Sequence, residues 1–336
     1  MIISRAPVRI TLGGGGTDLP SYYEKYEGFL IAGTINKYVF VGANRQFHDT
    51  IKLNYSKSEE VTDVKEILHN LFREALKFKK IGKGIELHSL ADIPAGSGLG
   101  SSGAFLISLL NTLHVYKYGV PATKRQLAEE ACKIELEILK EHEGKQDKYA
   151  CAFGGITAYT FFKDGNVSVR PLANEDVLIN ELEAKMLIFY TGKNRESTAS
   201  NVLKFQDEKC KEDDHNVVEK LHNIKKIGLK TMKALENNNF DDFGYFLNEH
   251  WEMKKQYSPH ATSLFTDKCY KIALAKGALG GKVMGAGGGG FFLFYHPGTE
   301  KKKKEFIDAL KHLGLHQLPF KFDKTGISTM FTEEAI

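Results

Sequence analysis

Residues 94–105, Pro-Ala-Gly-Ser-Gly-Leu-Gly-Ser-Ser-Gly-Ala-Phe, combine the residue types that bind anions. Four glycines let the backbone turn tightly and come close to a ligand. Ser101 or Ser102 then opens a helix predicted at 102–118, whose unpaired N–H groups and positive dipole end would face that ligand. A nucleotide phosphate suits such a site. The sequence therefore predicts an ATP-binding loop formed by Pro94, Ala95, Gly96, Ser97, Gly98, Leu99, Gly100, Ser101 and Ser102.

Two other nucleotide-binding motifs share part of this pattern. The spacing G-x-G-x-x-G occurs at 98–103 and again at 285–290. A dinucleotide-binding fold, however, also needs an acidic residue about twenty residues after the loop, and residues 120–124 are Val-Pro-Ala-Thr-Lys. A Walker loop needs Gly-Lys followed by Ser or Thr, which this chain lacks. The pattern thus favours a different kind of ATP site.

Phosphoryl transfer from ATP also requires metal ligands and a group that orients the attacking hydroxyl. Mg²⁺ prefers hard oxygen ligands, so Ser102 and either Glu135 or Glu137 are candidates. A helical glutamate is nevertheless more often a solvated surface acid. Asp147 precedes the small, apolar segment 149–153, where partial desolvation would let its carboxylate act as a base. Residue type alone leaves its role open.

The elements that must position these residues alternate between strand and helix patterns. Strand patterns occur at 2–12, 29–34, 38–45, 51–55, 84–90, 156–162, 167–171 and 185–191. Helical patterns occur at 64–78, 102–118, 123–139 and 301–313, with three or four further helices between 198 and 276. The polar, acidic segment 174–183 predicts a linker. The chain is therefore predicted to be α+β, with domains at 1–175 and 176–336 and the active site between them.

Composition excludes several other classes of protein. The 336 residues carry a net charge of only +4, which gives no indication of a nucleic-acid partner. No apolar run reaches membrane-spanning length, so no membrane association is expected. The four cysteines lack C-x-x-C spacing, which predicts reduced thiols in a cytoplasmic protein.

Three motifs in this chain resemble those of the GHMP kinases, the superfamily of galactose, homoserine, mevalonate and phosphomevalonate kinases. They are residues 5–10 (RAPVRI) with Gly16-Thr17-Asp18, the loop 94–102, and residues 282–290 (KVMGAGGGG). The resemblance implies an N-terminal domain like domain 2 of ribosomal protein S5 and a ferredoxin-like C-terminal domain. It also implies ATP and Mg²⁺ as cofactors.

The same resemblance implies roles for individual residues. Ser102 and Glu135 would bind Mg²⁺; Glu135 is preferred to Glu137 because it lies twelve residues before Asp147, as in the sugar-kinase branch. Asp147 would be the catalytic aspartate, with Arg9 as the basic residue beside it. The substrate would be bound by Gly15, Gly16, Thr17, Asp18, Asp147, Gly287 and Gly288.

One departure from the family indicates a substrate. Galactokinases have Glu-His before Thr-Asp, whereas this chain has Gly15-Gly16 at that place. The Gly-Gly-Thr-Asp motif, together with residues 144–149 and 250–255, is similar to that of D-glycero-D-manno-heptose 7-phosphate kinases. The likeness implies phosphorylation of the anomeric hydroxyl to give the 1,7-bisphosphate, in nucleotide-activated heptose biosynthesis. A phosphorylated substrate needs an extra cationic pocket, for which the candidates are Lys193, Arg195, Lys254 and Lys255. A fucokinase-like or hexose 1-kinase, and a non-catalytic sugar- or nucleotide-binding protein, remain alternatives.

Overall fold

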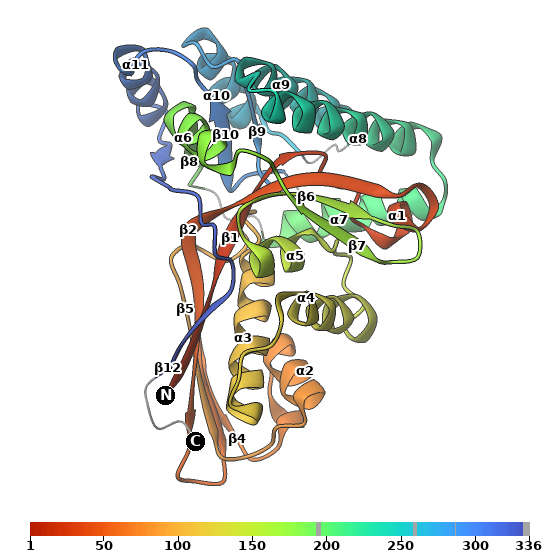
Figure 1. Cartoon of the computed structure of the whole chain (residues 1–336), viewed down its shortest axis with the longest axis vertical. Coiled ribbons are helices and arrows are strands. Elements are labelled where there is room, and N and C mark those ends of the chain that lie inside the picture. The colour runs from red at the N-terminus through yellow and green to blue at the C-terminus, as the bar shows by residue number, and fades with distance from the viewer. Residues whose placement is uncertain (193–195, 258–260, 286, 332–336) are drawn as a thin grey trace.

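Two β-sheets, each covered by helices, organise the chain (Figure 1). The computed structural model describes residues 1–192, 196–257, 261–285 and 287–331. Within them, the first sheet has the strand order β12-β1-β2-β5-β3-β4, and β6 and β7 extend it from β2. Its strands are β1 (Ile2–Gly13), β2 (Gly28–Arg45), β3 (Ile51–Asn54), β4 (Ser58–Val61), β5 (Ile85–Ala91), β6 (Ile156–Phe161), β7 (Val167–Pro171) and β12 (Ser328–Phe331).

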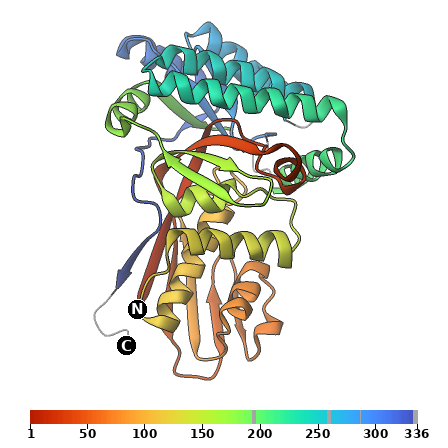
Figure 2. The same ribbon diagram turned by 45° about the vertical axis from the view of Figure 1, so that its right-hand side comes forward.

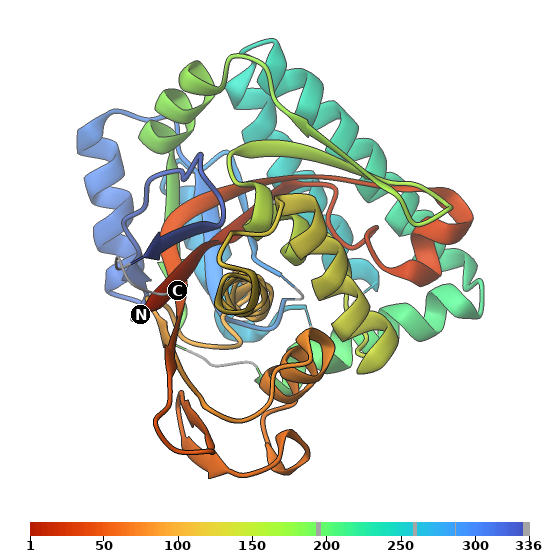
Figure 3. The ribbon, with the colours of Figure 1, turned by 60° about the horizontal axis from the view of Figure 1, so that its bottom comes forward.

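Helix α3 (Ser101–Tyr118) lies at the centre of this first part of the molecule, and Figure 3 looks almost along its axis. It is apolar on nearly all sides, as a fully buried helix must be. It packs on β1 and β2, and the helices around it are α2 (Asn70–Lys79), α4 (Lys124–Cys132) and α5 (Gln146–Phe153). Ser108 Oγ and Thr112 Oγ1 donate hydrogen bonds to the β2 carbonyls of Val39 and Val41, at 2.9 and 3.0 Å. The start of α3 is thereby fixed relative to the sheet.

The second sheet is antiparallel throughout and has the strand order β11-β8-β10-β9. Its strands are β8 (Met186–Tyr190), β9 (Gly280–Val283), β10 (Phe291–Tyr295) and β11 (His316–Gln317). The helices of this half are α7 (Glu196–Lys211), α8 (His215–Glu236), α9 (Phe240–Tyr257), α10 (Leu264–Ala275) and α11 (Glu300–Lys311). Helix α8 also packs on β1 and β2, so it ties the two halves together. The predicted α+β architecture is confirmed.

Several element boundaries differ from the sequence predictions. Residues 29–34 and 38–45 form one strand, β2, because the chain stays extended between them. The predicted linker at 174–183 is wrong, since it forms helix α6 (Glu175–Lys185). Leu178 and Leu182, one helical turn apart, are fully buried there, and their burial outweighs the polar composition around them. In the predicted helix at 123–139, the α-helical part α4 ends at Cys132, and the residues after it form a π-helical segment, η2 (Lys133–Ile138).

The two ends of the described chain lie side by side (Figure 2). Strand β12 pairs with β1 in antiparallel register, from Ile2 opposite Phe331 to Arg5 opposite Ser328. The last strand therefore returns to the first sheet, and the predicted division at 175/176 stays a prediction. Among the described residues, no helix combines the length and the apolar character needed to cross a membrane.

Candidate active site

The predicted phosphate loop connects β5 to α3. Gly96, Gly98 and Gly100 have φ values of 66°, 87° and 78°, a left-handed conformation that glycine adopts without strain. Gly100 is the N-cap residue of α3, and no side chain caps the first turn, so its amides remain available to an anion. The Ser97 hydroxyl is buried without a hydrogen-bond partner among the described residues, which fits a loop built around an absent polar ligand.

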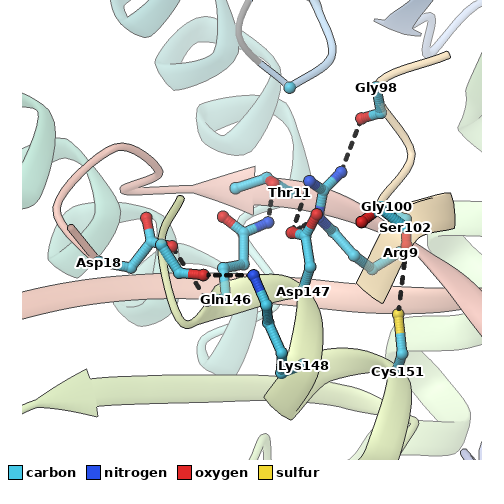
Figure 4. A network of polar contacts seen from close by, with 12 residues as sticks. Arg9, Thr11, Asp18, Gly98, Gly100, Ser102, Gln146, Asp147, Lys148 and Cys151 are labelled. Carbon is cyan, nitrogen blue, oxygen red and sulfur yellow. Dashed lines mark hydrogen bonds and ion pairs between the residues drawn. The ribbon is translucent and has the colours of Figure 1, made fainter. Parts of the chain in front are cut away.

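Asp147 and Arg9 form the centre of a polar network beside this loop (Figure 4). Arg9, on β1, is 6% exposed, and Asp147 lies in the first turn of α5. Arg9 Nε and Nη2 lie 2.7 and 2.6 Å from Asp147 Oδ1, while Nη1 donates to the Gly98 carbonyl at 2.7 Å. The guanidinium thus joins the carboxylate directly to the phosphate loop, in the arrangement predicted for the catalytic pair.

Glycines let Asp147 approach the start of α3 closely. A Cβ atom at Gly103 would lie only 2.6 Å from Asp147 Cβ, and one at Gly100 would lie 3.1 Å from Asp147 Oδ2. A larger residue at position 103 would displace the aspartate. Among the described residues, none donates a hydrogen bond to Oδ2, so this oxygen remains available to a substrate hydroxyl.

The two predicted metal ligands lie together beside the first turn of α3. Ser102 Oγ donates a hydrogen bond to Glu135 Oε1 at 3.0 Å, and Glu135, in η2, is 3% exposed. Its other oxygen pairs with the buried Lys148 ammonium, which also donates to the Gly144 carbonyl. Burial disfavours that ammonium, but the carboxylates of Glu135 and Glu143 raise the pKa of Lys148. Glu137 is exposed, so the geometry favours Glu135.

Two adjacent hard oxygens fit Mg²⁺ that is held mainly by nucleotide phosphates and water. No cluster of three or more histidine, cysteine or carboxylate side chains suited to a metal occurs in the described part of the chain. Ser102 and Glu135 are the predicted ligands that would hold the metal together with the phosphates and water.

Asp18 lies in a second glycine-rich turn, opposite the start of α5. Its Oδ2 accepts a hydrogen bond from the Gln146 amide at 3.0 Å, and its carbonyl accepts one from the Lys145 amide at 3.1 Å. Burial raises the pKa of Asp18, and the nearby Asp147 charge adds to this effect. A Cβ atom at Gly144 would lie 1.9 Å from Asp18 Oδ2, so only glycine allows this contact.

A cavity between the two halves brings most of the predicted substrate residues together. Those lining it are Gly15, Gly16, Asp18 and Asp147, and Arg9 of the predicted catalytic pair lines it too. Thr17 is fully buried instead, and its hydroxyl accepts a hydrogen bond from the Phe29 amide, so it supports the turn rather than facing the cavity. Gly287 and Gly288 pack near Ala261 and are not among the described residues that line the cavity.

The candidates for the extra cationic pocket divide in the same way. Lys254 lines the cavity, whereas Lys255 forms an ion pair with Glu252 at 2.7 Å and does not line it. Lys193 and Arg195 lie outside the described residues.

Sequence reasoning missed six further polar residues of the cavity, which are Thr11, Glu143, Gln146, Gln206, His250 and Lys282. Burial raises the pKa of Glu143 to about 7, and the charges of Asp147, Glu135 and Asp18 add to the effect. Glu143 and Gln146 flank Asp147 in the sequence, and Lys282 opens the C-terminal glycine motif. Proximity to those motifs was the available signal. His250 likewise opens the segment 250–255 that the resemblance singles out, whereas Gln206 had no comparable local signal.

Comparisons with known proteins agree with this geometry. Residues 64–155 match the GHMP kinases N terminal domain, and residues 231–314 match the GHMP kinases C terminal domain. The chain is 30% identical to a D-glycero-alpha-D-manno-heptose 7-phosphate kinase of Campylobacter jejuni, over 98% of both chains.

Solved structures show the same relationship. A D-glycero-D-manno-heptose 1-phosphate kinase from Bacteroides thetaiotaomicron superposes with a TM-score of 0.81 at 25% identity, covering 99% of this chain and all of the other. A galactokinase of Lactococcus lactis shares the fold. It superposes with a TM-score of 0.77 at 19% identity, covering 98% of this chain and 95% of the other. The N-terminal and C-terminal motifs line one cavity, and Arg9 bonds the loop 94–102 beside it. This chain belongs to the GHMP kinase superfamily and has the predicted fold of that superfamily.

Proposed function

We propose that this protein transfers the γ-phosphoryl group of ATP to the anomeric hydroxyl of D-glycero-D-manno-heptose 7-phosphate, giving the 1,7-bisphosphate. GHMP kinases use ATP, typically with Mg²⁺. The observation that carries the proposal is the Arg9 bridge, which holds Asp147 at the junction of the phosphate loop and the sugar cavity. A hydroxyl in that cavity would meet a bound triphosphate at the aspartate.

Each group at the junction has a role in this reaction. The amides of residues 96–103 would hold the phosphates, and Asp147 Oδ2 would accept or orient the proton of the attacking hydroxyl. Arg9, directly beside that carboxylate, would face the charge that develops on the transferred group. Mg²⁺ held by Ser102 and Glu135 would neutralise phosphate charge when bound.

The cavity suits a polyhydroxylated substrate. Asp18 and Glu143 offer carboxyl oxygens to sugar hydroxyls, and Gln146 and Thr11, joined by a short hydrogen bond, line the same cavity. The heptose 7-phosphate itself is inferred from the C. jejuni relative at 30% identity. A cytoplasmic location is part of the proposal, and the four cysteines, all buried free thiols, support it.

A fucokinase-like activity is the second candidate, because the chain is 24% identical to a bifunctional fucokinase/GDP-fucose pyrophosphorylase of Arabidopsis thaliana over 89% of its length. This relative is much longer, since the match spans 30% of it.

A substrate panel tests the choice. ADP release would be measured with heptose 7-phosphate, heptose 1-phosphate, heptose, mannose, fucose and galactose, and the product identified by phosphorus NMR. We expect the highest kcat/KM with heptose 7-phosphate and a new anomeric phosphate signal. A higher kcat/KM with fucose or another unphosphorylated sugar would favour the second candidate and refute the proposed substrate.

A further inference from the structure

Three basic side chains form the C-terminal wall of the cavity. His250 and Lys254 lie one turn apart on α9, and Lys282 lies on the neighbouring strand β9. They are 4%, 8% and 3% exposed, respectively. The N-terminal half contributes the acids Asp18, Glu143 and Asp147 to the same cavity, here called its acidic wall, together with the base Arg9.

Lys282 differs from other buried lysines in what neutralises its charge. Lys148 pairs with Glu135, and Lys79 pairs with Glu130 at 2.5 Å. In contrast, the one polar neighbour of the Lys282 ammonium among the described residues is His250 Nδ1, at 3.4 Å. Lys254 Nζ donates to the carbonyl of Gly285, which also lines the cavity.

A buried ammonium without a carboxylate is costly. Burial lowers the pKa of Lys282 to about 7, and the charge of Arg9 adds to the effect. Burial also holds the pKa of His250 well below its ordinary value, with the charges of Lys282 and Lys254 contributing. A neutral His250 accepts a hydrogen bond from Lys282 at Nδ1 and leaves Nε2–H as a donor. Lys282 and His250 therefore offer donors and positive charge that an anion would complete.

We propose that His250, Lys254 and Lys282 bind the phosphate group that the sugar substrate already carries. This inference rests on the proposed function, since it takes the substrate to be a sugar phosphate. The acidic wall would hold the sugar hydroxyls, and the basic wall would hold the phosphate at the other end of the molecule.

The γ-phosphoryl group of ATP offers the same chemistry, but the geometry favours the substrate. The cavity lined by this basic wall is also lined by Gly15, Gly16 and Asp18, and no described residue of the loop 94–102 lines it. The nucleotide phosphates belong at that loop, which Arg9 joins to the cavity, and we assign the basic wall to the substrate because it shares the cavity with the predicted sugar residues.

Lys282→Met removes the charge while keeping a side chain of similar length. Initial rates would be measured with heptose 7-phosphate and with the same heptose lacking the phosphate. We expect the KM for heptose 7-phosphate to rise about 10- to 100-fold, the range for one lost charged hydrogen bond, with kcat/KM for heptose and the KM for ATP unchanged. Lys255→Met is the matched control, since Lys255 lies on the same helix, pairs with Glu252 and should leave both substrates unaffected.

Equal losses with both sugars would overturn the inference, because the cluster would then act on the transferred phosphoryl group or on the fold. An unchanged KM would overturn it too. Lys282→Gln, which keeps a donor without the charge, serves as the second variant, and thermal unfolding checks both. Loss of an unpaired buried charge should not lower Tm.

A binding measurement separates this inference from the proposed function. Calorimetry would compare mannose 6-phosphate with mannose, on wild type and Lys282→Met. Tighter wild-type binding of mannose 6-phosphate that Lys282→Met abolishes would support the phosphate site even if heptose 7-phosphate proved to be a poor substrate. Equal binding of the two sugars by wild type would overturn the phosphate site, even if heptose 7-phosphate were turned over.

Discussion

Replacing Asp147 by asparagine tests the reaction centre with little change in shape. In the native protein Oδ1 accepts both contacts from Arg9, and Oδ2 points toward the loop, near the Cβ position of Gly100. With the asparagine carbonyl kept toward Arg9, the amide nitrogen takes the place of Oδ2. It donates where the carboxylate accepts, so it cannot take the proton of the hydroxyl.

The size of the effect follows from this exchange. A positioned acid or base contributes about 10²- to 10⁴-fold, which corresponds to about 3–5 kcal/mol of the activation barrier at 1.36 kcal/mol per tenfold. The cost in stability should be smaller, at about 1–2 kcal/mol, because Arg9 keeps its bond to Gly98 and the Asp147 side chain is 19% exposed.

The assay is ADP release at saturating substrates, with nucleotide affinity measured separately by fluorescence or calorimetry. Asp147→Asn should bind ATP with wild-type affinity and lose at least about 100-fold in kcat. A kcat within about threefold of wild type in a folded, ATP-binding variant would refute the role given to Asp147.

Three further perturbations address the groups around this centre. Glu135→Gln should raise the Mg²⁺ concentration for half-maximal activity about 10- to 100-fold, whereas the exposed Glu137→Gln should not; a reversed order would assign the metal to Glu137. Gly103→Ala puts a methyl group 2.6 Å from Asp147 Cβ and should reduce kcat and Tm, while Gly82→Ala, with open space around it, should change neither, and equal effects would contradict the packing argument. Glu143 has its pKa raised by burial to about 7, so its contribution to stability is full below the unfolded pKa near 4.5 and is lost as pH rises through 7. In denaturant titrations the free energy of unfolding should therefore fall less between pH 4.5 and 7 in Glu143→Gln than in wild type. The same pH profile in both proteins would rule out the raised pKa.

Local patterns predicted the parts of the site that depend on neighbouring residues. The phosphate loop and α3 were predictable because glycine, serine and a continuous apolar helix follow one another directly. The Arg9–Asp147 pair joins residues 138 positions apart, and the resemblance to a family, rather than composition, suggested it.

The basic wall was only partly predictable, because tertiary packing decides it. Lys254 and Lys255 are adjacent in the sequence and equally basic, yet one faces the cavity and the other an acid on its own helix. Which of them faces inward depends on how α9 rotates against β9. For the same reason His250 and Lys282, 32 residues apart, meet only in the folded chain.

A crystal structure with a non-hydrolysable ATP analogue, Mg²⁺ and sugar phosphate would test the central claim most directly. The account predicts that the γ-phosphate lies against the amides at the start of α3, with the anomeric hydroxyl between it and Asp147 Oδ2. A triphosphate bound away from residues 96–103, with those amides facing solvent, would contradict it.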